Sequence, residues 1–261
     1  MSEESARIGF ANIADVVSIS ADGRLPLVVG GQAVNIWAIA YAPRVGSTLR
    51  AYEPFVSNDL DLYGPRKILD ELSKKYHVPI RLSPPRFPGI GQVVIPIGKG
   101  ELKVELLSGI RGVPRIGEEN MVEMVVQGVH LQVLDPVSCL AAKISNAAQI
   151  DQTGRQDVKH VEIMKICASE YAKDIVTGEP QAFSERVIVN VLERLRETIT
   201  GADAHKVTHK WNISFDNVLP VEAIQKSKMP KVQNFLRYRL GRSLKAGPAP
   251  RNRPGGQGMG M

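Results

Sequence analysis

The sequence is poor in cysteine, in aromatic residues and in long apolar stretches. It has 261 residues, of which two are cysteine and 5% are aromatic. Two thiols in so long a chain exclude a disulfide scaffold, and we expect both Cys139 and Cys167 to be buried, reduced and inert. The few aromatic residues form no series of the kind that stacks single-stranded nucleic acid.

No apolar run reaches the roughly 18 to 20 residues that span a bilayer. The start of the chain, Met1–Ser5, is polar and acidic, whereas a secretory signal needs a basic start and then an apolar stretch. We therefore expect a cytoplasmic protein with no membrane partner.

Acidic residues are missing from the C-terminal end. From Lys226 onward there are nine Lys or Arg and no Asp or Glu, whereas the preceding residues hold 24 cations against 27 acids. A cationic end on a faintly acidic body indicates either a polyanionic partner such as RNA or a segment that serves only solubility. The sequence leaves both interpretations open.

What is present is an ordinary globular composition, 43% hydrophobic and 23% charged, with strand and helix signals that alternate in the first half. A buried strand is predicted over 25–29, followed by the Gly30–Gly31 turn and a helix over 33–42 that ends at Pro43. A short strand over 59–63 precedes a helix that reaches Tyr76. Further strands are predicted at 79–82, 92–97, 102–107, 121–127 and 129–134, the last two as a hairpin.

Helical patterns dominate after residue 134. Asp135-Pro136 combines an N-cap residue with proline at the first helical position, and further helices are predicted over 155–171, over 183–199 and from Pro230. The sequence therefore predicts a sheet domain over 1–134, a helical domain over 135–246 and a disordered, basic, Gly/Pro-rich tail over 247–261.

Three carboxylates are the candidate metal ligands. Asp59 and Asp61 are two apart on a predicted strand, so both side chains point to one face, where they repel each other unless a cation lies between them. Alone, this pair is a frequent accident of strand ends. Glu105 adds a third carboxylate amid apolar residues on another strand, where an unpaired buried charge would be costly. Three carboxylates on neighbouring strands form an oxygen-rich site for Mg²⁺ or Mn²⁺.

The glycine pair Gly30–Gly31 lies between a strand and a helix. Glycine there lets a phosphate approach the backbone and the positive end of the helix dipole. Tight strand-to-helix turns also use glycine for geometry alone, so the pair carries weight only together with the carboxylates.

Together these motifs resemble the DNA-polymerase-β-like nucleotidyltransferase superfamily. Val28-Val29-Gly30-Gly31, Ser57-Asn58-Asp59-Leu60-Asp61-Leu62 and Val104-Glu105-Leu106 follow one another on three strands. The chain is most similar to the branch that includes the nucleotidyltransferase toxins of abortive-infection (type IV toxin–antitoxin) systems. Gln32-Ala33, Ser57, the run from Leu140 to Lys143, and Arg155-Gln156-Asp157 fit that branch, and the resemblance covers roughly residues 25–172.

The chain departs from the branch at two positions. The branch usually has an arginine four residues before the first Asp, where this chain has Phe55, so Arg44 or Arg50 must substitute or phosphate contact is weaker. The third carboxylate is Glu105, where Asp is commoner in the family.

The resemblance implies an α+β fold: a nucleotidyltransferase-type mixed β-sheet with flanking helices, followed by a C-terminal helical domain. It also implies metal-dependent transfer of a nucleoside monophosphate from an NTP to an acceptor. Asp59 and Asp61 would hold two Mg²⁺ (or Mn²⁺) ions, and Glu105 would hold the ion nearer the acceptor hydroxyl and help to deprotonate it. The expected nucleotide-binding residues are Gly30, Gly31, Ser57, Lys143 and Arg155.

Several readings stay open at this level. Lys143 either binds phosphate or snorkels at the edge of its helix, and Arg155 either binds nucleotide or pairs with Asp157 at a helix start. His205 and His209 are spaced as two metal ligands on a helix, but no third ligand accompanies them.

The function is equally open on one point, the acceptor. It is an RNA end, a protein hydroxyl or a small molecule such as an aminoglycoside, and a protein antitoxin is a further expected partner. Two alternatives to catalysis are a nucleotidyltransferase-like scaffold that binds nucleotide, RNA or protein without turnover, and an unrelated α/β protein with an accidental match.

Overall fold

The computed structural model describes residues 9–84, 88–98, 100–178 and 183–240. Its strands are β1 (Leu27–Val29), β2 (Leu60–Tyr63), β3 (Arg81–Leu82), β4 (Gly89–Ile97), β5 (Gly100–Leu107), β6 (Met121–Val126) and β7 (Val129–Leu134). Its α-helices are α1 (Phe10–Val17), α2 (Gly30–Val45), α3 (Ser47–Arg50), α4 (Lys67–Tyr76), α5 (Pro136–Gln149), α6 (Asp157–Thr177), α7 (Glu185–Thr200), α8 (Ala202–Trp211), α9 (Val221–Lys226) and α10 (Pro230–Phe235). A 3₁₀ turn, Glu118–Asn120, precedes β6, and a π turn, Leu236–Leu240, follows α10.

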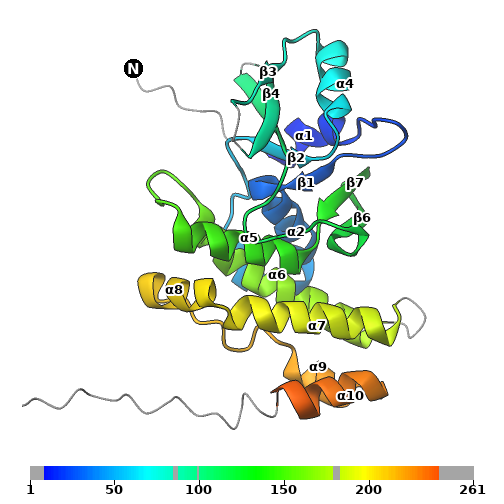
Figure 1. Ribbon diagram of the computed structural model, residues 1–261, viewed down its shortest axis with the longest axis vertical. Coiled ribbons are helices and arrows are strands. Elements are labelled where there is room, and N and C mark those ends of the chain that lie inside the picture. Colours follow the sequence, from blue (N-terminus) through cyan, green and yellow to red (C-terminus); the bar gives the residue numbers. More distant parts are fainter. Residues whose placement is uncertain (1–8, 85–87, 99, 179–182, 241–261) are drawn as a thin grey trace, which may run out of the picture.

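The strands form one mixed sheet in the order β3-β4-β5-β2-β1-β7-β6. β2 is parallel to β5 and β1 is parallel to β7, while the remaining neighbours are antiparallel. Figure 1 shows this sheet at one end of the molecule, with α5 and α6 beneath it and α7 to α10 farther away. The predicted α+β class, a mixed sheet with flanking helices followed by helices, is confirmed.

The sheet core comes from alternating strand positions. Leu60, Leu62, Val104 and Leu106 are buried because side chains two apart on a strand share one face. Asp61 and Glu105 therefore point to the opposite face, as the strand pattern predicts.

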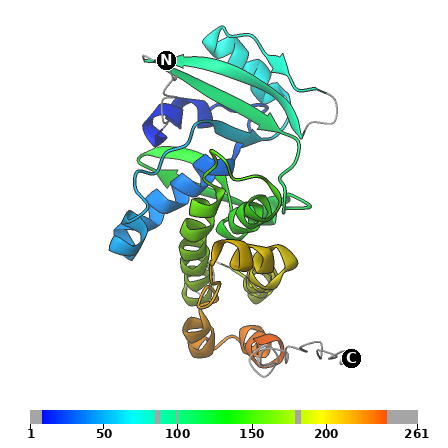
Figure 2. The same ribbon diagram turned by 90° about the vertical axis from the view of Figure 1, so that its left-hand side faces the viewer.

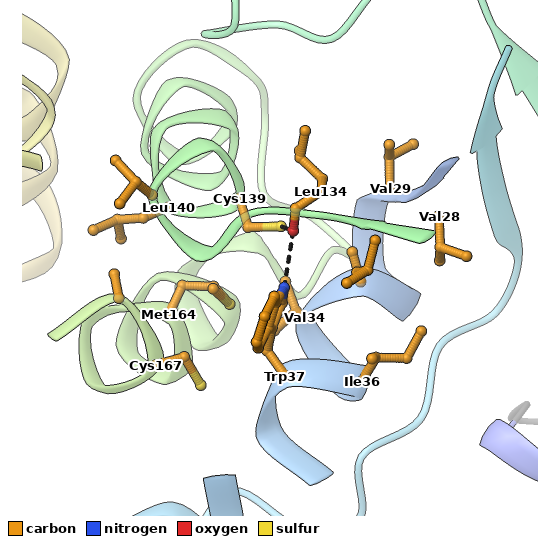
Figure 3. Close-up of a cluster of buried hydrophobic side chains, with 14 of the residues drawn as sticks. Val28, Val29, Val34, Ile36, Trp37, Leu134, Cys139, Leu140, Met164 and Cys167 are labelled. Atoms are coloured by element: carbon orange, nitrogen blue, oxygen red, sulfur yellow. Dashed lines mark hydrogen bonds between the residues drawn. The ribbon is translucent and has the colours of Figure 1, made fainter. Parts of the chain in front are cut away.

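The packing of α2 joins the sheet to the first helices of the second half. Trp37 on α2 donates its indole N–H to the carbonyl of Leu134, at the end of β7, over 2.8 Å. Figure 3 shows this bond inside a cluster that also holds the two free cysteines, Cys139 and Cys167. Both thiols are buried, as predicted, and burial raises the pKa of each.

The start of α5 matches its prediction. The Asp135 side chain accepts hydrogen bonds from the N–H groups of Val137 and Ser138, with Pro136 as the first helical residue. The same carboxylate pairs with Arg194 of α7 over 2.8 Å. The N-cap of α5 thereby also fixes α7.

Several element boundaries differ from the predictions. α2 begins directly at Gly30 and continues past Pro43 to Val45. Proline removes one backbone hydrogen bond there, but the Gly46 N–H still bonds to the Ala42 carbonyl and closes the last turn. α6 begins at Asp157 rather than at residue 155 and continues to Thr177. α1 was not predicted.

The sequence pattern predicts an apolar face for α7, and it is confirmed only in part: of Phe183, Val187, Val191, Leu192, Leu195 and Ile199, the residues Val191, Leu192 and Leu195 are buried. Phe183 precedes the helix, and both Phe183 and Val187 are 43% exposed, whereas Ile188 is buried. The buried face is therefore turned toward Ile188.

The basic C-terminal segment lies partly outside the described residues. The expected tail, 247–261, is not described, nor are Arg242, Lys245 and Leu244. A helical wheel of the segment from Pro230 predicts Arg239 within its apolar sector. In the structure Arg239 is instead 61% exposed and pairs with Glu193 over 2.9 Å. Figure 2 shows α9 and α10 at the end of the molecule opposite the sheet.

The predicted boundary after residue 134 coincides with the change from strands to helices, but a division into domains stays a prediction. Within the described residues, none of the helices has the length and apolar character that a membrane span requires. The cytoplasmic location stays a prediction.

Candidate functional site

The glycine pair and Asp61 meet where β1 passes into α2. Val29, the last residue of β1, lies opposite Asp61 of β2 in the sheet register. Gly30 has a φ of +66°, and a Cβ added there would overlap the Asp61 carboxylate. Only glycine both adopts this backbone conformation and leaves room for the acid.

Gly31 is constrained by two other side chains. A Cβ at Gly31 would lie 2.5 Å from Oγ of Ser57 and 3.3 Å from Cε1 of His160. Ser57 in turn donates a long hydrogen bond of 3.4 Å to Oδ1 of Asp59. Because the two glycines at the start of α2 have no side chains, Ser57, Asp61 and His160 can all lie close to its backbone.

Asp61 is the most perturbed acid of this group. Burial raises its pKa to about 7, with Asp59 and Glu105 adding to the effect and Lys143 and Lys103 opposing it. A carboxyl group that keeps its proton near neutral pH for want of positive charge is a natural position for a cation.

Two cations lie across from these acids, on the segment between α5 and α6. Lys143 on α5 is buried and binds Oδ1 of Asp157 over 2.9 Å, while Arg155 binds Oδ2 over 2.7 Å. Asn146 donates to Asp157 as well. Burial raises the pKa of Asp157, but Lys143 and Arg155 outweigh it and hold the pKa at about 2.

His160 is a member of the site that sequence analysis missed. It is 4% exposed, and its Nδ1 has no hydrogen-bond partner among the described residues. Burial and the charge of Lys143 lower its pKa to about 3, so the ring is neutral. It lies one helical turn after Asp157, but no spacing in the sequence links it to Gly31.

These groups line one cavity of about 140 Å³. Six of the eight predicted site residues border it: Gly31, Ser57, Asp59, Asp61, Lys143 and Arg155. Gly30 lies next to the Asp61 side chain but does not border the cavity. The structure therefore brings the predicted carboxylates and the predicted cations together from four segments of the chain.

Glu105 is the exception. It lies beside Asp61 in the parallel register of β2 and β5, but its carboxylate pairs with Lys103 and borders a second cavity of about 260 Å³. Among the described residues no group of three or more His, Cys, Asp or Glu is placed to hold a metal ion. Asp59 and Asp61 suit a hard cation, whereas Glu105 has one carboxylate oxygen engaged by Lys103. The three-carboxylate metal site stays a prediction.

Neither arginine suggested as a substitute at the Phe55 position lines the cavity. Arg44 binds Asp174 over 2.6 Å and Glu170 over 2.9 Å. Glu170 lies 13 residues beyond Asp157 on α6, which corresponds to about 20 Å of helix. Arg155 provides the arginine that the cavity has.

Two further hollows lie elsewhere. One, of about 610 Å³, lies beside Ser138 and Ala141 of α5 and Arg194 of α7. His205 and His209 border another on α8 together with Lys206 and Lys210.

A scan of protein-family models and a search of curated proteins gave no match to this sequence. Among solved structures, the chain is similar to an antigenic nucleotidyltransferase-like protein from Paracoccidioides brasiliensis, with 14% sequence identity and a TM-score of 0.39. The match covers 80% of this chain and 96% of that protein. A likeness this distant carries no argument about activity, which must be argued from the geometry of the cavity.

Proposed function

We propose that this chain transfers a nucleoside monophosphate from an NTP to an acceptor hydroxyl, with the NTP bound in the cavity between Asp59, Asp61, Lys143 and Arg155. One observation carries the proposal. Two adjacent carboxylates, one with its pKa raised to about 7, face a lysine and an arginine across a single cavity at the start of α2. An NTP site needs carboxylates that bind the metal ion and cationic side chains that bind the phosphates.

Each residue then has a role. Asp59 and Asp61 would hold Mg²⁺, which supplies charge neutralisation for the phosphates. Lys143 and Arg155 contact phosphate oxygens, and Asp157 positions both cations by its two oxygens. Ser57 and the N–H groups at the start of α2 donate hydrogen bonds to the same phosphates.

The reaction forms a bond between the acceptor oxygen and the α-phosphorus. The bond from that phosphorus to the bridging oxygen breaks, and pyrophosphate leaves with the electron pair. The acceptor proton passes to Glu105 or to water. An RNA end, a protein hydroxyl and a small molecule are the acceptor classes to compare, and the toxin-like role and a protein antitoxin belong to the same proposal.

A second candidate is a scaffold that binds nucleotide, RNA or a protein partner without turnover. The pairing of Glu105 with Lys103 favours it, because a third carboxylate bound to lysine does not assist an acceptor. The two candidates differ only in chemistry, so a transfer assay separates them.

The test uses α-³²P-labelled NTPs, Mg²⁺ and cell extract, with the label resolved into RNA, protein and small-molecule fractions. We expect label in one fraction, lost with EDTA and with Asp61→Asn. Asp70→Asn on the exposed side of α4 is the matched control and should transfer normally. Mg²⁺-NTP binding is measured in parallel by thermal shift, since a ligand at 100 times its Kd adds about 2.7 kcal/mol of stability.

Three results are informative. Binding with no transfer in any fraction supports the scaffold. A protein that neither binds Mg²⁺-NTP nor transfers label is neither the transferase nor a nucleotide-binding scaffold. Normal transfer by Asp61→Asn contradicts the assignment of the site.

A further inference from the structure

A polar row runs from Asp61 across the sheet to its edge. Asp61 lies opposite Glu105, Glu105 opposite Gln92, and Gln92 opposite Arg81. Residues directly opposite each other in neighbouring strands point to the same side of a sheet. Arg81, Gln92, Glu105 and Asp61 therefore share one face of β3, β4, β5 and β2.

The other face of these strands is apolar. Val93, Val104 and Leu62 are buried there, and α4 packs against β4. On the polar face, Gln92, Lys103 and Glu105 are only half-buried and Arg81 is exposed. This part of the sheet therefore has one filled face and one open face.

The open face is hollowed. A cavity of about 260 Å³ is bordered by Arg81, Ser83, Gln92, Lys103 and Glu105. It is separate from the cavity that holds Asp59 and Lys143, but Glu105 and Asp61, side by side in the register, connect the two.

We propose that this second cavity is the acceptor subsite, and that the acceptor carries a phosphate group close to its reacting hydroxyl. The inference rests on the proposed function, because it takes the cavity of Asp59 and Asp61 as the place of the NTP. Glu105 then lies between donor and acceptor.

The charges select the class of acceptor. Arg81 and Lys103 border this cavity together with one acid, Glu105, and Arg81 makes no ion pair with any described residue. Asp59 and Asp61 also act on Lys103, but in the proposed function the metal ion that they hold would neutralise them. A phosphate satisfies both cations, whereas a cationic acceptor such as an aminoglycoside would meet two like charges at short range.

The Lys103–Glu105 pair gives the subsite a second role. When an acceptor phosphate binds Lys103, it replaces Glu105 as the partner of the ammonium group. The freed carboxylate is then available to take the proton of the acceptor hydroxyl as the new bond to phosphorus forms. Lys103 and Arg81 are positioning residues in this scheme, since they bind the part of the acceptor that does not react.

The first test is binding, which needs no turnover. Ribose 5-phosphate and a short RNA with a 3′-hydroxyl are titrated into the full chain by calorimetry, beside ribose and an aminoglycoside. The two phosphate probes distinguish a small phosphate ester from a polynucleotide. We expect at least one of them to bind, and Arg81→Gln and Lys103→Gln each to weaken it about ten-fold or more.

The matched controls are Arg24→Gln and Lys74→Gln, which remove exposed cations that do not border the cavity, and both should bind the phosphate probe as the parent does. Mg²⁺-NTP thermal shift shows that each variant is folded and that its donor cavity is intact. Equal binding of the phosphate probe by Arg81→Gln, Lys103→Gln and the controls would overturn the proposal, as would tighter binding of the aminoglycoside.

The second test is transfer of label from α-³²P-NTP to the same probes. We expect label on a phosphate-bearing probe and not on ribose, with a raised KM for that probe in Arg81→Gln and an unchanged KM for NTP. Label on ribose and ribose 5-phosphate alike would overturn the subsite and leave the proposed function standing. Phosphate binding that depends on Arg81, with no transfer at all, would overturn the proposed function and leave the phosphate site standing.

Discussion

Asp61 gives the metal-free protein a pH dependence of known sign. Its pKa is about 7 in the folded chain and about 3.9 when unfolded. Between these values the folded state binds a proton that the unfolded state has lost, so this group's contribution to stability falls as pH rises from about 4 to 7. Asp61→Asn does not titrate, and we expect it to be more stable than the parent at pH 8 and nearly equal at pH 4, by urea unfolding without metal.

The control variant Asp70→Asn should show the same change of stability with pH as the parent, because Asp70 is exposed. Added Mg²⁺ should raise the stability of the parent at pH 8 and leave Asp61→Asn unchanged. A parent curve parallel to that of Asp61→Asn from pH 4 to 8 would show that Asp61 ionises normally.

Gly30→Ala tests why the first glycine is there. An alanine at Gly30 would strain the positive φ and overlap the Asp61 carboxylate. We expect the single change to cost more than the roughly 1 kcal/mol of a strained backbone alone. In Asp61→Ala the carboxylate is gone and only the Cβ remains, 2.8 Å from the added methyl group, so Gly30→Ala made in that background should cost clearly less than in the parent.

Urea unfolding of both single variants and the double variant measures this coupling. Equal costs of Gly30→Ala in the two backgrounds would mean that Asp61 does not constrain Gly30.

At the residue scale the sequence predicted most of the residues that line the cavity, but it missed His160 and placed Glu105 there. Gly30, Gly31 and the two aspartates were predicted to bind phosphate and metal, which stays a prediction; the structure adds that the glycines make room for Asp61, Ser57 and His160. His160 is 129 positions from Gly31, and a lone histidine on a helix carries no periodic signal. Burial and neighbours, which only the fold supplies, distinguish it.

The junction of α5 and α6 depends on a buried ion pair. Lys143 and Asp157 have side chains only 8% and 3% exposed, whereas Arg155 is 42% exposed. Lys143→Met leaves a buried carboxylate short of charge, and we expect a cost of about 3 kcal/mol or more. Arg155→Gln removes a solvated partner and should cost about 1 kcal/mol or less.

The double variant Lys143→Met with Asp157→Asn should recover part of the loss, since the unpaired charge is gone. Chemical unfolding at pH 7 gives the order of the four stabilities. An Arg155→Gln variant less stable than Lys143→Met would reverse our assignment of the principal partner.

Element boundaries were harder to predict than element types. The alternation of β2 and β5 and the Asp135-Pro136 start of α5 carry local signals, and both are found in the structure. α2 passes Pro43 because its buried residues, among them Trp37 and Tyr41, pack against the sheet and α6, and such tertiary contacts are invisible to a local rule.

The molecule as a whole keeps its two charged features apart. The cavity of Asp59 and Lys143 lies between the sheet and the segment that joins α5 to α6, and the described cations from Lys226 onward lie on and around α9 and α10, with Lys226 bound to Glu222 and Arg239 to Glu193. A polyanion that reaches both the cavity and α10 must therefore be long.

If the acceptor is RNA, Lys228→Gln with Lys231→Gln should lower the slope of log K against log salt by roughly 0.7 to 0.9 per lost contact. We expect this lower slope only for RNA long enough to reach from the cavity to α10, and no change of slope for a trinucleotide. Fluorescence anisotropy over several salt concentrations measures both, and identical slopes for parent and variant on long RNA would leave this end a solubility feature.

The two tryptophans are placed so that each reports on a different half. Trp37 of α2 is buried and bonded to Leu134 at the end of β7, and Trp211 of α8 is half-buried and donates to Ala147 of α5 over 3.2 Å. Trp211→Phe leaves an emitter in the sheet half, and Trp37→Phe leaves one among the helices. Because α2 packs on α6 and α5 packs on α8, one continuous core joins the two indoles. The unfolding midpoints that the two tryptophans report should therefore fall at the same denaturant concentration. Two separated midpoints would instead show that the two halves of the chain unfold independently.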